Sequence, residues 1–197
     1  MKLNVSKTKE VFCCLKSWKC LLPSMVYNIQ QVEAVNLLGF MFENSLKPAK
    51  HLDSVISKCN QHLFLLNQIK KAGAQTKELE ILYISFVQTR VLYCSALFII
   101  ISKYQLQKLQ RFYDTAYKRQ FLSEKVDIEA LINSKSLGLF QEIQRKPNNI
   151  LHQLLPQKSR RPQRKVSSMY SSQYCIDKCR TETFRQSFFC RHLFCNL

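Results

Sequence analysis

Hydrophobic positions between Lys50 and Ala72 recur at spacings of three and four residues, which is the period of an amphipathic α-helix. Gly73 lies where a left-handed residue commonly ends a helix, shortly after Lys70 and Lys71, whose charges suit a C-terminal helix dipole. The pattern therefore predicts a long helix over residues 50–72 with one apolar stripe, formed by Leu52, Val55, Ile56, Cys59, Leu63, Leu66 and Ile69.

A second helical period begins at Thr76, whose side-chain oxygen can cap a helix. Glu78 and Glu80 follow in the first turns, where carboxylates favour the N-terminal end. The sequence then becomes apolar on every side from Val91 to Ile101, which predicts a central, fully buried helix. The residues of the preceding turns that we expect to be buried are Leu79, Leu82, Tyr83, Phe86 and Val87.

A third helix is predicted to start after Ser102, a suitable N-cap. One side of this helix is apolar, with Leu106, Leu109, Tyr113 and Ala116, and the opposite side is basic, with Lys108, Arg111, Lys118 and Arg119. A shorter helix is expected over Val126–Asn133, ending near Ser136-Leu137-Gly138. The block from Pro48 to Phe121 has the most sustained helical period of the chain.

Short apolar runs, separated by polar or proline-containing stretches, fill the first 42 residues and favour a small antiparallel sheet. The runs are Val11–Leu15, Met25–Ile29 and Leu37–Phe42. The expected fold is therefore mainly α, with a small N-terminal antiparallel β segment (1–47), a three- to four-helix bundle (48–146) and a basic, mostly disordered tail (147–197).

The large positive charge of the chain indicates which class of partner it binds. The 197 residues carry a formal net charge of +17, from 30 Lys and Arg against 13 Asp and Glu. Such an excess favours polyanionic partners, either nucleic acid or an anionic surface. The charge is unevenly distributed along the chain, because residues 145–197 alone hold eleven basic and two acidic side chains.

No Gly-rich phosphate loop, HExxH motif or nucleophile elbow occurs in the sequence.

The nine Cys are expected to be free thiols in a reducing compartment, nuclear or cytoplasmic. Their number is odd, and lysines interrupt the N-terminal residues before an apolar signal run forms. The apolar window from Leu79 to Ile101 contains Glu80, Gln88 and Arg90, so its uninterrupted part is too short for a membrane-spanning helix. No membrane partner is therefore predicted.

Two groups of basic residues are candidates for phosphate contact, because Lys and Arg release counterions from a polyanion. The first group is Lys70, Lys71, Lys118 and Arg119, for which an ordinary solvated helix face is the simpler interpretation. The second lies in the tail and could also serve nuclear import or be merely solvated; its residues are Lys158, Arg160, Arg161, Arg164 and Lys165.

Two further interpretations have simpler alternatives. Thiolate and imidazole ligands suit zinc, but the spacing of Cys175, Cys179, Cys190, His192 and Cys195 is irregular, so no metal site is predicted.

Aromatic residues interleave with Lys and Arg in the third helix and could stack on bases. Core packing is the commoner reason for such helical spacing; these residues are Tyr104, Phe112, Tyr113 and Tyr117.

Several motifs, in this order and spacing, resemble the C-terminal part of reverse transcriptases of non-LTR (LINE-type) retrotransposons. They are Leu3–Glu10, Leu37–Phe40, His51–Asp53 with Lys58 and Leu63–Leu66, Leu82–Val87, Val91–Ser95, Lys108–Arg111 and Ser187–Arg191 with Asn196. The chain departs from the family at Phe98 and Cys195, where the family has Trp, and at Cys190, where it has Pro.

The resemblance implies a thumb-side fragment, whose helices hold the template–primer duplex. Nucleotidyl transfer in that family uses two metal ions on paired aspartates of a palm domain, which would precede Met1. No two acidic residues are adjacent in this sequence, so we expect no polymerase activity and no cofactor in this chain, any Mg²⁺ belonging to the palm. Met1 would then be an internal start, and the chain a truncated, inactive remnant that retains the template–primer-binding region.

Two other interpretations remain. The segment Leu3–Glu10 also resembles a short stretch grouped with the N-termini of AlkB-homologue tRNA-modifying proteins. Iron dioxygenase chemistry needs two His and a carboxylate. The chain has four His, of which only His51 begins a His-x-Asp pair, His51-Leu52-Asp53, and this activity is not predicted; the others are His62, His152 and His192. The main alternative is a small, basic, helical interaction protein without enzymatic activity, which binds a protein partner through Leu79–Ile101.

Overall fold

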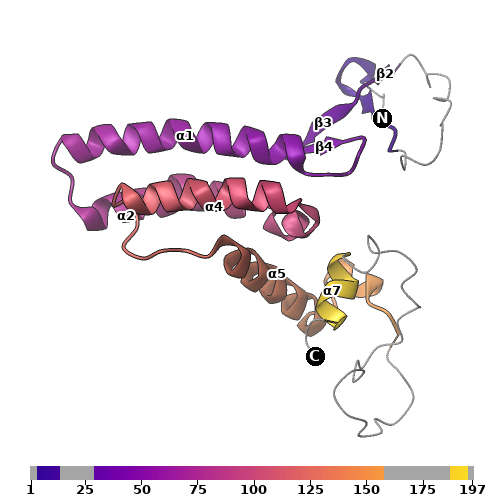
Figure 1. The fold of residues 1–197 in the computed structure, drawn as a ribbon. Coiled ribbons are helices and arrows are strands. Elements are labelled where there is room, and N and C mark those ends of the chain that lie inside the picture. The colour runs from indigo at the N-terminus through magenta and orange to yellow at the C-terminus, as the bar shows by residue number, and fades with distance from the viewer. Residues whose placement is uncertain (1–3, 14–28, 158–186, 195–197) are drawn as a thin grey trace, which may run out of the picture. The chain divides into compact units, whose positions relative to one another are not determined.

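The computed structural model describes residues 4–13, 29–157 and 187–194. The described part is mainly helical and carries a small two-stranded antiparallel sheet near its N-terminal end, which confirms the predicted fold class (Figure 1). The chain divides into two compact units. The first comprises residues 1–91 and 101–125, and the second comprises residues 92–100 and 126–197.

The antiparallel sheet of the first unit is a tight hairpin of β3 (Ala34–Leu37) and β4 (Phe40–Glu43), with Leu37 opposite Phe40. Leu38 and Gly39 between the strands both have positive φ, 51° and 86°, as a two-residue turn of the type that matches strand twist requires. The sequence prediction of one apolar strand over Leu37–Phe42 was therefore wrong, because the turn lies inside that run.

Two short elements complete the N-terminal part. A single 3-10 turn, η1 (Val5–Lys7), is followed by β1 (Lys9–Glu10), which pairs in parallel with β2 (Gln30–Gln31). The predicted strand over Val11–Leu15 is not formed at Val11, Phe12 or Cys13, and its remaining residues lie outside the described ones. The same holds for Met25–Ile29, of which only Ile29 is described.

Helix α1 (Ala49–Lys71) matches the predicted first helix to within one residue at each end. Its predicted apolar stripe is buried from Leu52 to Leu66, but Ile69 is 39% exposed, because the stripe runs beyond the packed part of the helix. Gly73 has φ +100° and closes the helix. The Gly73 N–H donates to the Lys70 carbonyl and the Ala74 N–H to the Ile69 carbonyl, which together form a Schellman motif.

The hairpin packs on the first turn of α1 through Glu43 and His51. The Glu43 carboxylate accepts the backbone N–H of Lys50 at 2.7 Å, so it satisfies one of the free donors at the helix start. The His51 ring lies against Phe40, with centroids 4.1 Å apart, and its Nδ1 accepts the N–H of Met41. Burial and the charge of Lys58 lower the pKa of His51, which keeps the ring neutral.

The second predicted helix is broken into pieces. Helix α2 (Thr76–Tyr83) continues through a π-helical turn, η2 (Ile84–Gln88), into the short α3 (Thr89–Leu92). Thr76 is the first helical residue rather than the cap; Gln75 precedes the helix, and Glu78 accepts its N–H. Phe86 was expected to be buried but is 53% exposed, because the π turn shifts the helical phase there.

The predicted central helix over Val91–Ile101 does not form. The chain leaves the helical conformation at Cys94, which has φ +55°, and continues as a 3-10 helix, η3 (Ser95–Ile100). Only some of the apolar side chains are buried, Val91 and Phe98 among them. The apolar residues of this stretch belong partly to the first unit and partly to the second, and they do not form one central helix.

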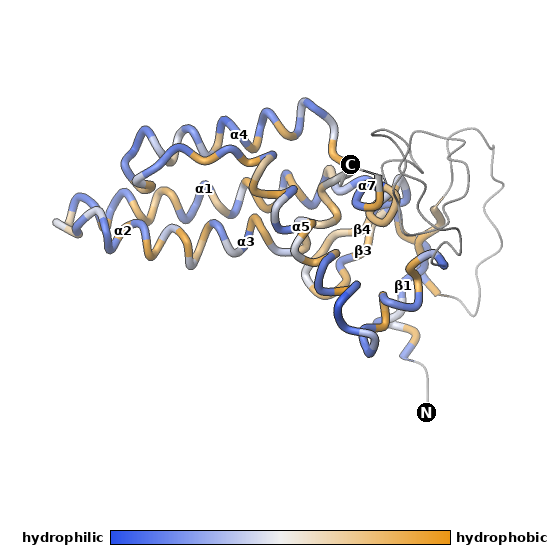
Figure 2. Tube along the Cα trace, turned by 90° about the horizontal axis from the view of Figure 1, so that it is seen from below, coloured by the Kyte–Doolittle hydropathy of each residue, from blue (hydrophilic) through white to orange (hydrophobic). Residues whose placement is uncertain are grey.

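Helix α4 (Lys103–Lys118) completes the first unit and starts at Ser102, as predicted. The Ser102 hydroxyl accepts the N–H of Gln105, and the Gln105 side chain accepts the N–H of Ser102 in return. Helices α1, α2 and α4 alternate hydrophobic and hydrophilic residues along their length, as amphipathic helices do (Figure 2). The α4 side chains that enter the core are Leu109, Phe112, Tyr113 and Ala116.

The second unit is built on α5 (Ile128–Arg145), which contacts η3, η4 (Ile150–Leu154) and α7 (Phe188–Phe194). Asp127 caps α5 by accepting two backbone N–H groups. The predicted end near Ser136-Leu137-Gly138 was wrong, because the buried stripe continues through Phe140 and Ile143 and Gly138 is accommodated within the helix. Neither η4 nor α7 was predicted.

Candidate nucleic-acid interface

Helices α1 and α4 run side by side in the same direction, which brings four predicted basic residues to one end of the first unit. Asp53 near the start of α1 pairs with Lys108 near the start of α4, and Lys70 near the end of α1 contacts Arg119 just after α4. The C-terminal cluster therefore consists of Lys70, Lys71, Lys118 and Arg119.

Lys70 has a structural partner. Its ammonium donates to the backbone carbonyl of Arg119 and to the Gln120 side-chain oxygen, both at 2.8 Å. Parallel helices place two negative dipole ends together, and Lys70 compensates one of them. This residue holds α1 and α4 together and is less available for phosphate than the sequence suggested.

The other three members of the cluster have exposed side chains. Within the described ranges, Lys71, Lys118 and Arg119 form no ion pair with a carboxylate. They lie where the helix dipoles favour cations, which by itself explains their presence. They remain able to meet a phosphate from solvent.

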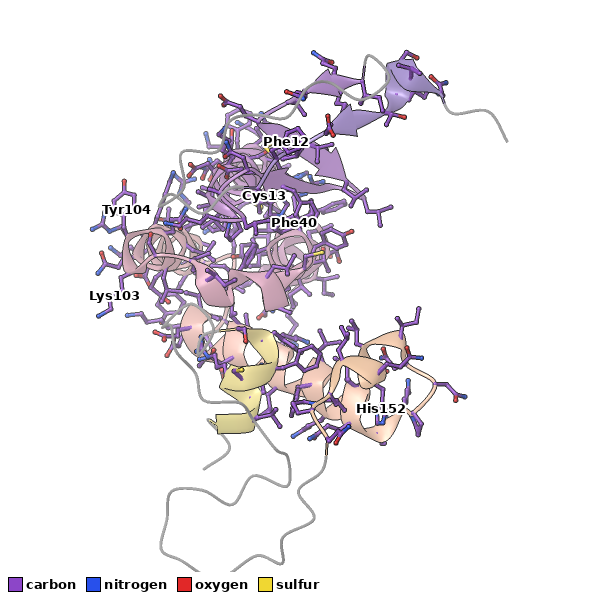
Figure 3. All side chains as sticks on the ribbon, turned by 90° about the vertical axis from the view of Figure 1, so that its right-hand side faces the viewer. Phe12, Cys13, Phe40, Lys103, Tyr104 and His152 are labelled. Carbon is purple, nitrogen blue, oxygen red and sulfur yellow. The ribbon has the colours of Figure 1, made fainter. Side chains whose placement is uncertain are left out.

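The solvent-facing side of α4 extends the basic surface along the helix. Lys103, Arg111 and Lys118 are exposed on it, whereas Lys108 is held by Asp53, whose hydrogen bond raises the pKa of the lysine. Tyr104 is 70% exposed, and Figure 3 shows Lys103 and Tyr104 projecting away from the helices. Lys103, Arg111 and Lys118 are thus basic side chains of this face that are open to solvent.

The aromatic residues of α4 separate into two groups. Phe112 and Tyr113 are buried in the core, as the simpler interpretation held, whereas Tyr104 and Tyr117 are exposed. Only the exposed pair could stack on bases. The tail candidates Lys158, Arg160, Arg161, Arg164 and Lys165 lie outside the described residues, as do Cys175, Cys179 and Cys195.

No metal site forms in the part of the chain that the structure describes, where no three His, Cys, Asp or Glu side chains converge on one point. Cys190 is buried, and His192 is engaged by Ser136 of α5, with Oγ and Nε2 2.5 Å apart. The His192 ring also stacks on Phe140, with centroids 5.3 Å apart. Both Ser136 and His192 are buried, so this pair anchors α7 rather than meeting a substrate.

Sequence reasoning missed a buried polar group in the first unit. The hydroxyls of Tyr83 and Tyr113 act on each other electrostatically without the geometry of a regular hydrogen bond, and burial raises the pKa of both. Burial also raises the pKa of the nearby Cys59 thiol to about 11, which keeps it protonated. All three residues fall on predicted apolar faces, so the pattern could not distinguish this cluster from ordinary core.

The chain has no match among protein-family models, curated proteins or solved structures. No helix in residues 4–13, 29–157 and 187–194 combines the length and apolarity needed to cross a membrane.

Proposed function

We infer that this chain is a non-catalytic, thumb-like fragment of a non-LTR reverse transcriptase and that it binds RNA or DNA without sequence preference. The motifs that resemble this family support the origin. The single observation that carries the binding is the solvent-facing side of α4, where Arg111 and Lys118 are exposed and form no ion pair with a described carboxylate.

Counterion release supplies the driving force for such binding. The net charge of +17 attracts a polyanion from a distance, and each neutralised phosphate of a duplex adds about −0.9 to the slope of log affinity against log salt. A surface of about four phosphate contacts would give a slope of roughly −3 to −4. Polymerase chemistry is not part of the proposal, because no two acidic residues are adjacent.

The test is a titration of labelled RNA hairpin and DNA duplex at several salt concentrations, with the full chain. Arg111→Gln together with Lys118→Gln should weaken binding about tenfold at low salt and reduce the salt slope by about two. The matched control is Lys47→Gln with Lys135→Gln, which removes two exposed charges elsewhere. No affinity at low salt, or an equal loss in both double variants, would refute the proposed interface.

A second function, protein interaction without nucleic acid, is favoured by exposed apolar residues in the stretch Leu79–Ile101. In the first unit these are Ile81, Ile84 and Phe86, and in the second unit Leu97 and Ile100. The genomic sequence just upstream of the Met1 codon distinguishes the two proposals by the origin of the gene. A remnant that encodes Ala-Asp-Asp supports the reverse transcriptase origin, and unrelated promoter sequence supports an independent interaction protein.

A further inference from the structure

Tyr104 is the most exposed aromatic side chain of α4. It is 70% exposed and projects away from the helices (Figure 3). Core packing accounts for Phe112 and Tyr113 of the same helix, which are buried, but it does not account for Tyr104. The face of the Tyr104 ring is therefore available to a ligand.

Tyr104 shares one side of α4 with two exposed cations. Arg111 lies seven residues after Tyr104, and Lys118 lies seven residues after Arg111. A helix drifts by only about 20° per heptad, so the three residues form one row along α4. We call Tyr104, Arg111 and Lys118 the outer row. At 1.5 Å per residue the row is about 21 Å long.

The surroundings of the outer row are polar. Gln107 and Thr115 are exposed beside it, and no exposed residue of α4, which the structure describes in full, is acidic. Asp114 of this helix is half-buried and accepts a hydrogen bond from the Gln110 side chain. Neither cation of the row pairs with a described carboxylate. The row thus offers one aromatic face and two cations to an anionic ligand.

We propose that the outer row binds unpaired nucleotides of a single strand, with a base stacked on the Tyr104 ring and phosphates on Arg111 and Lys118. Such binding rests on the proposed nucleic-acid function and names the form of nucleic acid that this surface takes. At about 3.4 Å per stacked nucleotide, a strand of about six nucleotides covers the row. Every base has a face that can stack on an aromatic ring, so the contact needs no particular sequence.

Base stacking is the contact that a fully paired duplex cannot make with Tyr104. Each internal base of a duplex lies between its stacked neighbours, so its face is closed to the ring. Charge alone favours the duplex instead, because counterion release per phosphate is larger for a duplex than for a single strand. The Tyr104 ring is therefore the group that adds affinity for unpaired bases.

An anionic membrane would also attract the two cations of the outer row. A helix that binds a membrane surface inserts a face of several large apolar side chains, whereas Tyr104 is flanked on α4 by the polar Gln107 and by Lys108. An acidic protein helix would likewise find no apolar anchor in the row beyond that one ring. A strand of nucleotides is the occupant that uses a single ring and two spaced cations.

The experiment compares two labelled probes of equal charge with the full chain. One is a strand of about 12 thymidine nucleotides, twice the length of the row, and the other is the same backbone without bases. Fluorescence anisotropy at low salt should show about tenfold tighter binding of the thymidine strand. Tyr104→Ala should weaken the thymidine strand about tenfold and leave the abasic strand unchanged, whereas Tyr104→Phe keeps the ring and should bind like the unaltered chain.

Two further variants separate stacking from charge. Tyr117→Ala removes the other exposed tyrosine of α4, which lies about 100° around the helix from Lys118, and it should leave binding of the thymidine strand unchanged. Arg111→Gln with Lys118→Gln should weaken both probes equally and reduce the salt slope by about 1.4, whereas Tyr104→Ala should not alter the slope. Helical circular dichroism should be the same in all variants, since every replaced side chain is exposed.

Equal binding of the two probes by the unaltered chain, or a preference for bases that survives Tyr104→Ala, would overturn the proposal and leave the proposed function intact. Equal weakening by Tyr104→Ala and Tyr117→Ala would overturn it as well. No affinity for either probe or for a duplex at low salt would instead refute the proposed function, and the outer row with it. Tighter binding to phosphatidylserine vesicles than to the thymidine strand, lost in Tyr104→Ala, would assign the row to a membrane.

Discussion

Lys70 illustrates how a residue chosen from sequence for one role takes another in the structure. The sequence places it in a basic cluster at the end of a helix, which equally predicts phosphate contact and dipole compensation. Its ammonium is committed to the Arg119 carbonyl and the Gln120 side chain, contacts some fifty residues away in sequence. No periodicity could reveal that contact, because it depends on α1 and α4 running parallel.

Lys70→Met should therefore destabilise the first unit by about 1 kcal/mol, since it removes a charge-assisted hydrogen bond to a helix terminus. Chemical denaturation followed by circular dichroism measures the change. Lys71→Met is the matched control, because its side chain is exposed and unpaired with any described carboxylate, and it should alter the free energy of unfolding little. An equal loss in the two variants would contradict the capping role.

At the scale of single elements, the long helices were predictable and the interruptions were not. Both α1 and α4 were anticipated because the apolar period agrees with the lysines and glycine at the end of α1 and with the Ser102 cap at the start of α4. The break at Cys94 and the extension of α5 past Gly138 were missed, because an apolar run does not reveal which part of it is buried. Within the candidate site, the basic face of α4 was predicted from the sequence. The hydrogen bond of Lys70 to the Arg119 carbonyl and the ion pair of Lys108 with Asp53 were not.

Two glycines offer a matched test of helix geometry. Gly138 lies inside α5, and a Cβ added there would meet nothing within 4 Å, so Gly138→Ala should stabilise the protein by about 1 kcal/mol. Gly73 has φ +100°, so Gly73→Ala should destabilise it by about 1 kcal/mol despite equally open space. Thermal or urea unfolding measures both, and changes of the same sign would contradict one of the two backbone assignments.

The attachment of α7 to α5 should weaken in acid. Burial, and to a lesser degree the charge of Arg191, lower the pKa of His192 in the folded protein. The unfolded chain then binds a proton more readily than the folded one. Stability from this residue is therefore complete above about pH 6.5 and declines as the pH falls below it.

Hydrogen exchange of the amides of Phe188–Phe194, corrected for intrinsic rates, should accordingly show less protection at pH 5.5 than at pH 7.5. The groups that face His192 are Ser136 and Phe140 of α5 and Phe188 and Arg191 of α7. His192→Phe keeps a ring against Phe140 and removes the titrating group, so its protection should not depend on pH. A persistent pH effect in that variant would assign the effect to another group.

At the scale of the whole chain, stability is expected to be uneven. The core of the first unit is contributed largely by α1, α2 and α4, whereas the β segment has one hairpin and two residue pairs between β1 and β2. Isolated hairpins are marginal in water, and hydrogen exchange reports such local differences. Amides of Ala49–Lys71 and Lys103–Lys118 should exchange more slowly than those of Lys9–Glu10 and Ala34–Glu43, and the reverse order would contradict this.

Glu43 has a consequence for where this chain can be divided. The last residue of β4 supplies the carboxylate that caps α1, so the border near residue 47 separates two sequence patterns but not two independent pieces. A fragment that began at Pro48 would start its longest helix without an acidic cap, because no acidic residue lies in the first turn of α1. A deletion that removed the hairpin would also remove the Glu43 carboxylate that caps the first turn of α1. Natural selection for a stable α1 would therefore preserve the two strands as well.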